Sequence, residues 1–317
     1  MNLFKDTKQY TKIYLLFLLI LCLSSIIAPF IKGLFDALLP SNHFIANLLD
    51  YENGSYDFGR VMRRIILVVA ILIIFFFRKS LMISSLATVG IKHTQGWWKL
   101  LQMGFFLSTG ISVLYTAFLF SIGTKTLNID AKSFGDLIFQ LIKILFIAGI
   151  VGCIEEVLFR GFIFQSFLHD MQSASAICFS SLFYSLLHFI KIKYLVSPGI
   201  QPFIGFVVMY QSFKNIIINI SPILPSMIGL FLVGVVLSYA CLRTRSLYFA
   251  IGLHAGWIFI IKTNKLFFDH VATNPKWLFG DSYLVTGVLG WILLIVTLAL
   301  VRFVTQMPSN KILPRTN

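Results

Sequence analysis

Long apolar runs, separated by short polar stretches, recur along the whole of this 317-residue chain. A helix of about 20 apolar residues is long enough to cross the ~30 Å hydrocarbon core of a bilayer. The pattern therefore predicts an all-α protein, a polytopic membrane helix bundle of about eight transmembrane helices. We expect these helices at residues 13–33, 62–78, 100–122, 136–157, 173–191, 223–242, 246–262 and 282–304.

Two longer connections interrupt this series. The first, Pro40 to Arg60, is polar, and the second runs from Lys191 to Pro225. Within the second, Phe203 to Tyr210 is apolar but too short to span a bilayer, so we expect an interfacial or re-entrant segment there. No internal repeat is evident, and we interpret residues 1–317 as a single membrane domain. An even number of spans places both termini on one side, and basic residues near the helix ends favour the cytoplasmic side.

Composition supports a membrane protein over other classes. The chain is 58% hydrophobic and 12% charged, about half the charged fraction of soluble domains. The net charge of +14 comes from basic residues scattered near helix ends, and no Lys/Arg-rich cluster of the kind that follows phosphates is present. We therefore expect membrane lipids, and no nucleic acid, among the partners, and we expect an integral protein of the cell membrane. The four cysteines are isolated and lack CxxC spacing, which argues against a disulfide framework or a thiolate zinc site.

Three ionisable residues interrupt one of the most apolar stretches of the chain. Glu155, Glu156 and Arg160 lie between Ile147 and Phe164. An ionisable group at membrane depth costs roughly 2.5–3.5 kcal/mol on insertion scales, and such groups usually mark function. Neighbours on a helix point about 100° apart, whereas residues four apart share a face. We therefore expect Arg160 to neutralise Glu156 and Glu155 to face elsewhere, where a carboxylate in an apolar bundle is a useful general base.

Away from the helix ends, the other ionisable residues within the predicted spans are few. They are Lys143, His188 and His254. The two histidines lie on separate predicted helices, and neither of these carries the glutamates. Buried interhelical hydrogen bonds alone could explain such groups, but two histidines and a glutamate on three helices favour a functional site.

Such a set can hydrolyse an amide in or beside the bilayer in two ways. Glu155 can polarise a water for attack on a carbonyl, one histidine holding that water or protonating the leaving amine and the other donating to the oxyanion. Alternatively, one glutamate and two histidines can bind zinc, with water as the fourth ligand. The sequence lacks the HExxH and GxSxG motifs of other hydrolases, which argues against those two site types.

The residues that carry this chemistry resemble a known family. Glu155-Glu156-x-x-x-Arg160, Tyr184-x-x-x-His188 and His254-Ala-Gly-Trp257 are similar, in order, to the three motifs of the CPBP family. That family contains the CAAX prenyl endopeptidases, also called Rce1-like or Abi proteins. The resemblance covers residues 137–262, which we interpret as the CPBP-like catalytic core.

The resemblance implies an eight-helix membrane protein that cleaves a membrane-associated protein or peptide. In the family's glutamate mechanism Glu155 activates water together with His188, and His254 helps to form the oxyanion hole; no cofactor takes part. The residues expected to support them are Glu156, Arg160 and Tyr184. Older descriptions of the family as metalloproteases imply the alternative of a zinc ion held by Glu155, His188 and His254.

One position departs from the family pattern. The third motif usually runs His-x-x-x-Asn, and the fourth residue after His254 is Ile258. An isoleucine side chain donates no hydrogen bond, and losing one oxyanion donor costs about 10²- to 10³-fold in kcat. This departure favours the alternative of a catalytically weakened or inactive family member that acts as a membrane scaffold or immunity protein.

Overall fold

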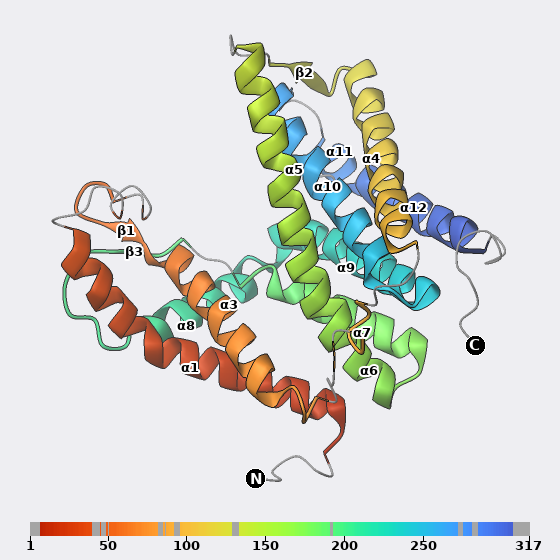
Figure 1. Ribbon diagram of the computed structural model, residues 1–317. Helices are drawn as coiled ribbons and strands as arrows, with labels where there is room; N and C mark the ends of the chain where they lie inside the picture. The colour runs from red at the N-terminus through yellow and green to blue at the C-terminus, as the bar shows by residue number, and fades with distance from the viewer. Residues whose placement is uncertain are drawn as a thin grey trace. The chain divides into compact units, whose positions relative to one another are not determined.

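The chain divides into two compact, mainly helical units (Figure 1). The computed structural model describes residues 7–39, 45, 49, 51–81, 85, 87–91, 96–128, 133–190, 193–271, 275–280 and 285–306. Unit 1 comprises Met1–Met82 and Leu186–Ile223, and unit 2 comprises Ile83–Ser185 and Leu224–Asn317. The predicted helical class is confirmed, whereas the assignment of residues 1–317 to a single membrane domain stays a prediction.

Unit 1 is built on the N-terminal helix. Its elements are α1 (Gln9–Leu38), β1 (Tyr56–Asp57), α3 (Phe58–Phe77), β3 (Leu195–Val196) and α8 (Ile204–Ile218). Helices α3 and α8 both pack on α1. Strands β1 and β3 pair antiparallel, with Tyr56 opposite Val196. This pairing joins two segments that are far apart in the sequence, and it brings the connection before α8 against the end of α1.

Unit 2 contains most of the apolar helices. Its elements are α4 (Trp97–Ser121), β2 (Lys125–Leu127), α5 (Phe134–Glu156), η2 (Val157–Phe164), α6 (Gln165–Asp170), most of α7 (Ser173–Leu187) and of α9 (Ile220–Thr244), α10 (Leu247–Phe267), β4 (Phe268–His270), α11 (Lys276–Phe279) and α12 (Val288–Gln306). Strands β2 and β4 pair antiparallel, with Thr126 opposite Asp269. The pairing ties the end of α4 to the end of α10.

Small residues allow α10 to pack closely against α4. A methyl group at Gly252 would overlap the carbonyl of Leu101, and one at Gly256 would overlap the side chain of Ser108. Such close approach through small residues four apart is typical of membrane helices. Since residues two apart on a helix point about 200° from each other, His254 between these two glycines faces away from α4. The packing therefore turns His254 toward α5.

Five helical segments are long and apolar enough to cross a membrane. Among the described residues these are Gln9–Leu38, Trp97–Ser121, Phe134–Asp170, Ile220–Thr244 and Val288–Gln306. The three other predicted spans are also helices. Helix α3 carries three arginines in its first two turns, α7 has only 15 residues, and the apolar sequence of the continuous helix α10 contains His254 and two lysines. Phe203 to Tyr210, expected as a short interfacial segment, lies at the start of the 15-residue helix α8.

Candidate active site

The two glutamates lie where one helical geometry changes into another. Helix α5 ends at Glu156, and the chain continues without a break as the π-helix η2. π-Helical turns, with i→i+5 hydrogen bonds, are rare and frequent at functional sites. Here the eight-residue π segment carries Arg160, which therefore projects from a wider turn than the one that carries Glu155 and Glu156.

A buried chain of three side chains connects η2, α5 and α10. Arg160 Nη1 donates to Glu156 Oε1 at 2.8 Å, and His254 Nδ1 lies 2.7 Å from the same oxygen. Glu156 is 0% exposed, Arg160 1% and His254 6%. A buried charge is tolerated only when a partner and hydrogen bonds compensate for its desolvation. The expected Glu156–Arg160 pair is present, and it also fixes an imidazole from another helix.

Glu155 reaches the other edge of the same imidazole. Its Oε2 lies 3.8 Å from His254 Nε2, and its side chain is 29% exposed. The expectation that the two glutamates face different surroundings is therefore wrong in one respect. Their 100° divergence does not separate them, because an imidazole has nitrogens on two edges and each carboxylate meets one of them. Glu156 is enclosed, whereas the Glu155 side chain is partly exposed, with its Oε2 buried on the side of the imidazole.

A glycine lets α5 and α10 approach at this level. A Cβ at Gly152 would lie 3.2 Å from the backbone nitrogen of Ala255 and 3.4 Å from the carbonyl oxygen of Ile251. Gly152 precedes Glu155 by one helical turn, and Ala255 follows His254 directly. A larger residue at this position would separate the two helices and lengthen the contacts from His254 to both glutamates.

Tyr184 supplies an aromatic wall to this group. Its ring packs edge-on against Phe159, with centroids 4.8 Å apart, and its centroid lies 6.4 Å from that of His254. The Arg160 guanidinium lies 4.5 Å from the centre of the Tyr184 ring, within the range of a cation–π contact. Tyr184 is 2% exposed. This geometry fits the supporting role that the second motif suggests.

His188 is not in the same unit as the other predicted residues. Helix α7 ends at Leu187, so His188 lies in the turn that follows rather than within a span. It belongs to unit 1, whereas Glu155 and His254 belong to unit 2. We name Glu155, Glu156, Arg160, Tyr184 and His254, which the structure brings together, the glutamate cluster. The convergence of His188 with this cluster stays a prediction.

The carbonyl of Gly234 in this region, and the buried Trp257 one turn beyond His254 on α10, were not assigned roles from the sequence, and the ionisable Lys143 lies elsewhere. The carbonyl of Gly234 on α9 accepts from Arg160 Nη2 at 3.4 Å. A glycine in an apolar helix gives no sequence signal of such a role. Trp257 is 4% exposed, and within the described part of the chain its Nε1 has no hydrogen-bond partner. Lys143, by contrast, is exposed on α5.

The metal alternative depends on His188. Among the residues that the structure describes, no group of three His, Cys, Asp or Glu side chains is arranged to hold a metal ion. A catalytic zinc needs three protein ligands, and the glutamate cluster supplies Glu155 and His254 from the proposed set.

Comparison with known proteins agrees with the motifs. Residues 137–260 match the model of the family described as type II CAAX prenyl endopeptidase Rce1-like. The recognition made from the motifs is thereby confirmed, and the matched segment contains the whole glutamate cluster and His188. No curated protein and no solved structure matches the chain.

Proposed function

We propose that the Rce1-like segment, residues 137–260, forms the catalytic part of an intramembrane endopeptidase. The observation that carries this proposal is the position of His254 between two glutamates, one enclosed and paired with Arg160, the other accessible. A purely structural buried network requires only the enclosed pair. An accessible carboxylate beside a fixed imidazole is the arrangement that general acid–base chemistry needs.

In this proposal Glu155 takes a proton from a water molecule, with His188 as its partner. The hydroxide attacks the carbonyl carbon of the scissile amide, and the resulting oxyanion accepts a hydrogen bond from His254. Because Nδ1 donates to the Glu156 carboxylate, Nε2 is the nitrogen that faces the reacting group, and its donation requires that both ring nitrogens carry a proton. The oxyanion then collapses to a carbonyl and the C–N bond breaks, while the proton held by Glu155 passes to the leaving amine nitrogen, which yields the acid and the amine.

The resemblance does not supply a second hydrogen-bond donor to the oxyanion. Ile258 replaces the usual asparagine and is half-buried on α10. Trp257, its neighbour, carries a buried indole N–H with no partner in the described part of the chain. We propose this N–H as the group that takes the place of the missing amide.

The substrate that we propose is a membrane-associated protein or peptide. The family description names CAAX sequences, and helices long and apolar enough to cross a membrane support a substrate that is associated with lipid. The cell membrane as location, and cytoplasmic termini, are part of the same proposal.

Replacement of Glu155 by glutamine tests the mechanism directly. We expect hydrolysis of a CAAX peptide by the reconstituted protein to fall by about 10²- to 10⁴-fold, the usual contribution of a general base. Glu52→Gln is a matched control, since Glu52 lies exposed in the turn before β1. Peptides with and without a prenyl group on the cysteine show whether prenylation is required. Unchanged hydrolysis by Glu155→Gln would show that Glu155 is not the general base.

Two further measurements separate the alternatives. Full activity after removal of metal would exclude a catalytic zinc, whereas its loss and its restoration by zinc would support the set Glu155, His188 and His254. Ile258 favours a non-catalytic scaffold. A scaffold would hydrolyse no peptide. Its Glu155→Gln variant would bind the membrane partner as well as the wild type does, which co-purification of the two proteins in detergent measures.

A further inference from the structure

A groove in unit 1 runs along the second half of α1. It has a volume of about 670 Å³ and is lined by Ser25, Ile26, Pro29, Phe30, Gly33, Asp36, Gly199, Ile200, Gln201, Pro202, Phe203 and Phe206. One wall is therefore α1, and the other is the non-helical segment before α8 together with its first turn. Pockets of 300–1,000 Å³ with mostly apolar walls and a few polar groups are typical of small-molecule sites.

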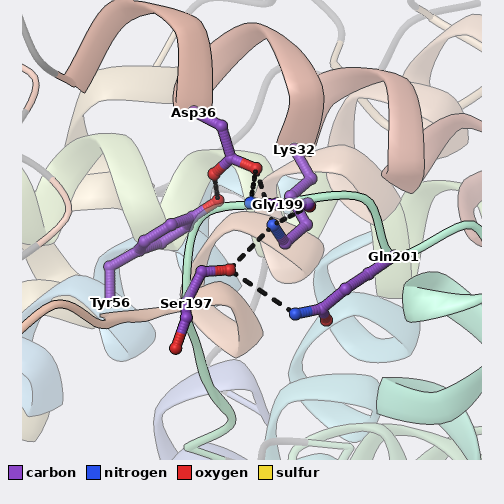
Figure 2. Close-up of polar contacts among 6 residues, drawn as sticks. All are labelled: Lys32, Asp36, Tyr56, Ser197, Gly199 and Gln201. Carbon is purple, nitrogen blue, oxygen red and sulfur yellow. Dashed lines mark hydrogen bonds and ion pairs between the residues drawn. The ribbon is translucent and has the colours of Figure 1, made fainter.

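Both ends of the groove are fixed by specific contacts. At one end Gly205 lies directly against the backbone of Ser25, whose carbonyl lacks its helical donor because proline at position 29 has no N–H. At the other end Lys32 Nζ donates to Asp36 Oδ2 at 2.6 Å, to Ser197 O at 3.0 Å and to Gly199 O at 2.8 Å (Figure 2). These contacts hold the two walls at a set distance.

The polar end is internally neutral and largely satisfied. Tyr56 donates to Asp36 Oδ1 at 2.7 Å, and the backbone nitrogen of Gly199 donates to Asp36 Oδ2 at 3.1 Å (Figure 2). Lys32, 1% exposed, is neutralised by Asp36. We name this group, with Ser197 and Gln201, the Lys32 network. A neutral and satisfied wall gives no charge to attract an ionic ligand into the groove, so its occupant must be held mainly by apolar contacts.

The dimensions of the groove match half a bilayer. From Ser25 to Asp36 a helix rises about 16 Å at 1.5 Å per residue, close to half of the ~30 Å hydrocarbon core. The groove lies on α1, which is long and apolar enough to span a membrane. Phe30, Ile200 and Phe203 on its walls are 75%, 97% and 70% exposed. Non-helical backbone at membrane depth needs its polar groups satisfied within the protein, and here Lys32 binds the carbonyls of Ser197 and Gly199 while Asp36 accepts from the Gly199 N–H.

From this geometry we infer that the groove is a specific site for one acyl chain of a bilayer phospholipid. The acyl chain lies between α1 and the start of α8. The glycerol end of the lipid lies at the Lys32 network, where α1 reaches the membrane–water interface. The groove shares no residue with the site proposed for proteolysis.

A substitution at Gly33, on the groove wall, can fill the groove without disturbing the backbone. A Cβ at Gly33 would meet nothing within 4 Å, so Gly33→Phe fills the groove without a backbone clash. Gly110→Phe is the matched control, since Gly110 on α4 also meets nothing within 4 Å and belongs to another candidate span. Ile200→Ser shortens the exposed groove wall, and Ile217→Ser is its control on the exposed face of α8, 74% exposed and outside the groove.

The experiment uses the full chain in phosphatidylcholine vesicles that carry a photoreactive group on one acyl chain. We expect cross-links to concentrate on peptides 25–36 and 199–206 and to fall by at least about tenfold, equivalent to 1.4 kcal/mol of binding, in Gly33→Phe but not in Gly110→Phe. Native mass spectrometry should show one retained phospholipid that Gly33→Phe and Ile200→Ser lose. Cross-links spread evenly over all lipid-facing helices, an unchanged yield in a folded Gly33→Phe, or a protein segment captured in place of lipid would each overturn the inference.

Discussion

Lys32–Asp36 in unit 1 and Glu156–Arg160 in unit 2 are both acid–base pairs four residues apart on one helical segment, at 2.6 and 2.8 Å. Their surroundings differ. Lys32 gives its two other hydrogen bonds to backbone carbonyls, whereas Glu156 also binds the imidazole of His254. One pair holds a loop in place, and the other orients the imidazole to which we assign the oxyanion. Spacing alone therefore does not separate a pair that ties down backbone from one that orients a side chain of another helix.

Breaking each pair should affect stability to different extents. Arg160→Met leaves Glu156, which is 0% exposed, without its cation, and we expect a loss of about 3–5 kcal/mol in the free energy of unfolding. Lys32→Met leaves Asp36 with 13% exposure and two remaining donors, so we expect about 1–3 kcal/mol. Unfolding of the purified protein in mixed micelles measures both, with Lys143→Met, at an exposed lysine, as the control. Equal losses of unfolding free energy in Arg160→Met and Lys32→Met would show that the two pairs do not differ in their contribution to stability.

The two acids should also differ in their effect on turnover. Glu156→Gln weakens a charge-assisted hydrogen bond to His254, worth about 1.5–3 kcal/mol, which corresponds to a fall of about ten- to hundredfold in kcat with little change in KM. Asp36→Asn should leave kcat within about twofold, because it removes no group from the glutamate cluster. Steady-state peptide hydrolysis gives both parameters. A larger loss in Asp36→Asn than in Glu156→Gln would reverse the assignment of roles.

The smallest expected effect concerns Tyr56, and it depends on pH. Burial, and then the hydrogen bond to Asp36, raise the pKa of Tyr56 above its ordinary value of 10.0. Tyr56→Phe removes one O–H donor and should cost about 0.5–1.5 kcal/mol at neutral pH. Above pH 10 the tyrosine ionises in the unfolded chain but not in the folded one, so the wild type loses this contribution as pH rises. The difference in stability between the two proteins should therefore narrow, and a constant difference up to pH 11 would contradict the role of this hydroxyl.

Sequence reasoning located the glutamate cluster well because its signal was local. Charges within an apolar run are costly wherever the helices lie, so Glu155, Glu156 and Arg160 could be singled out without a structure. The same reasoning missed Lys32 and Asp36. The predicted first helix ended at residue 33, whereas α1 continues to Leu38. Charged residues are common at the ends of membrane helices, so Lys32 and Asp36 gave no sign of a buried pair.

The sequence by itself determined that this is a helical membrane protein, where most of its helices lie, and which three motifs resemble those of the Rce1-like family. Hydrophobic periodicity and the cost of charge in lipid are properties of short segments, and they suffice for these conclusions. Only the tertiary structure decided that His254 lies between both glutamates, that Gly234 and Tyr184 complete the surroundings of Arg160, and that the 197–203 segment forms a groove with α1. These features depend on which helices approach each other and how closely. Glycines such as Gly152 and Gly205 permit a close approach, but a glycine in the sequence does not show which helix will lie against it.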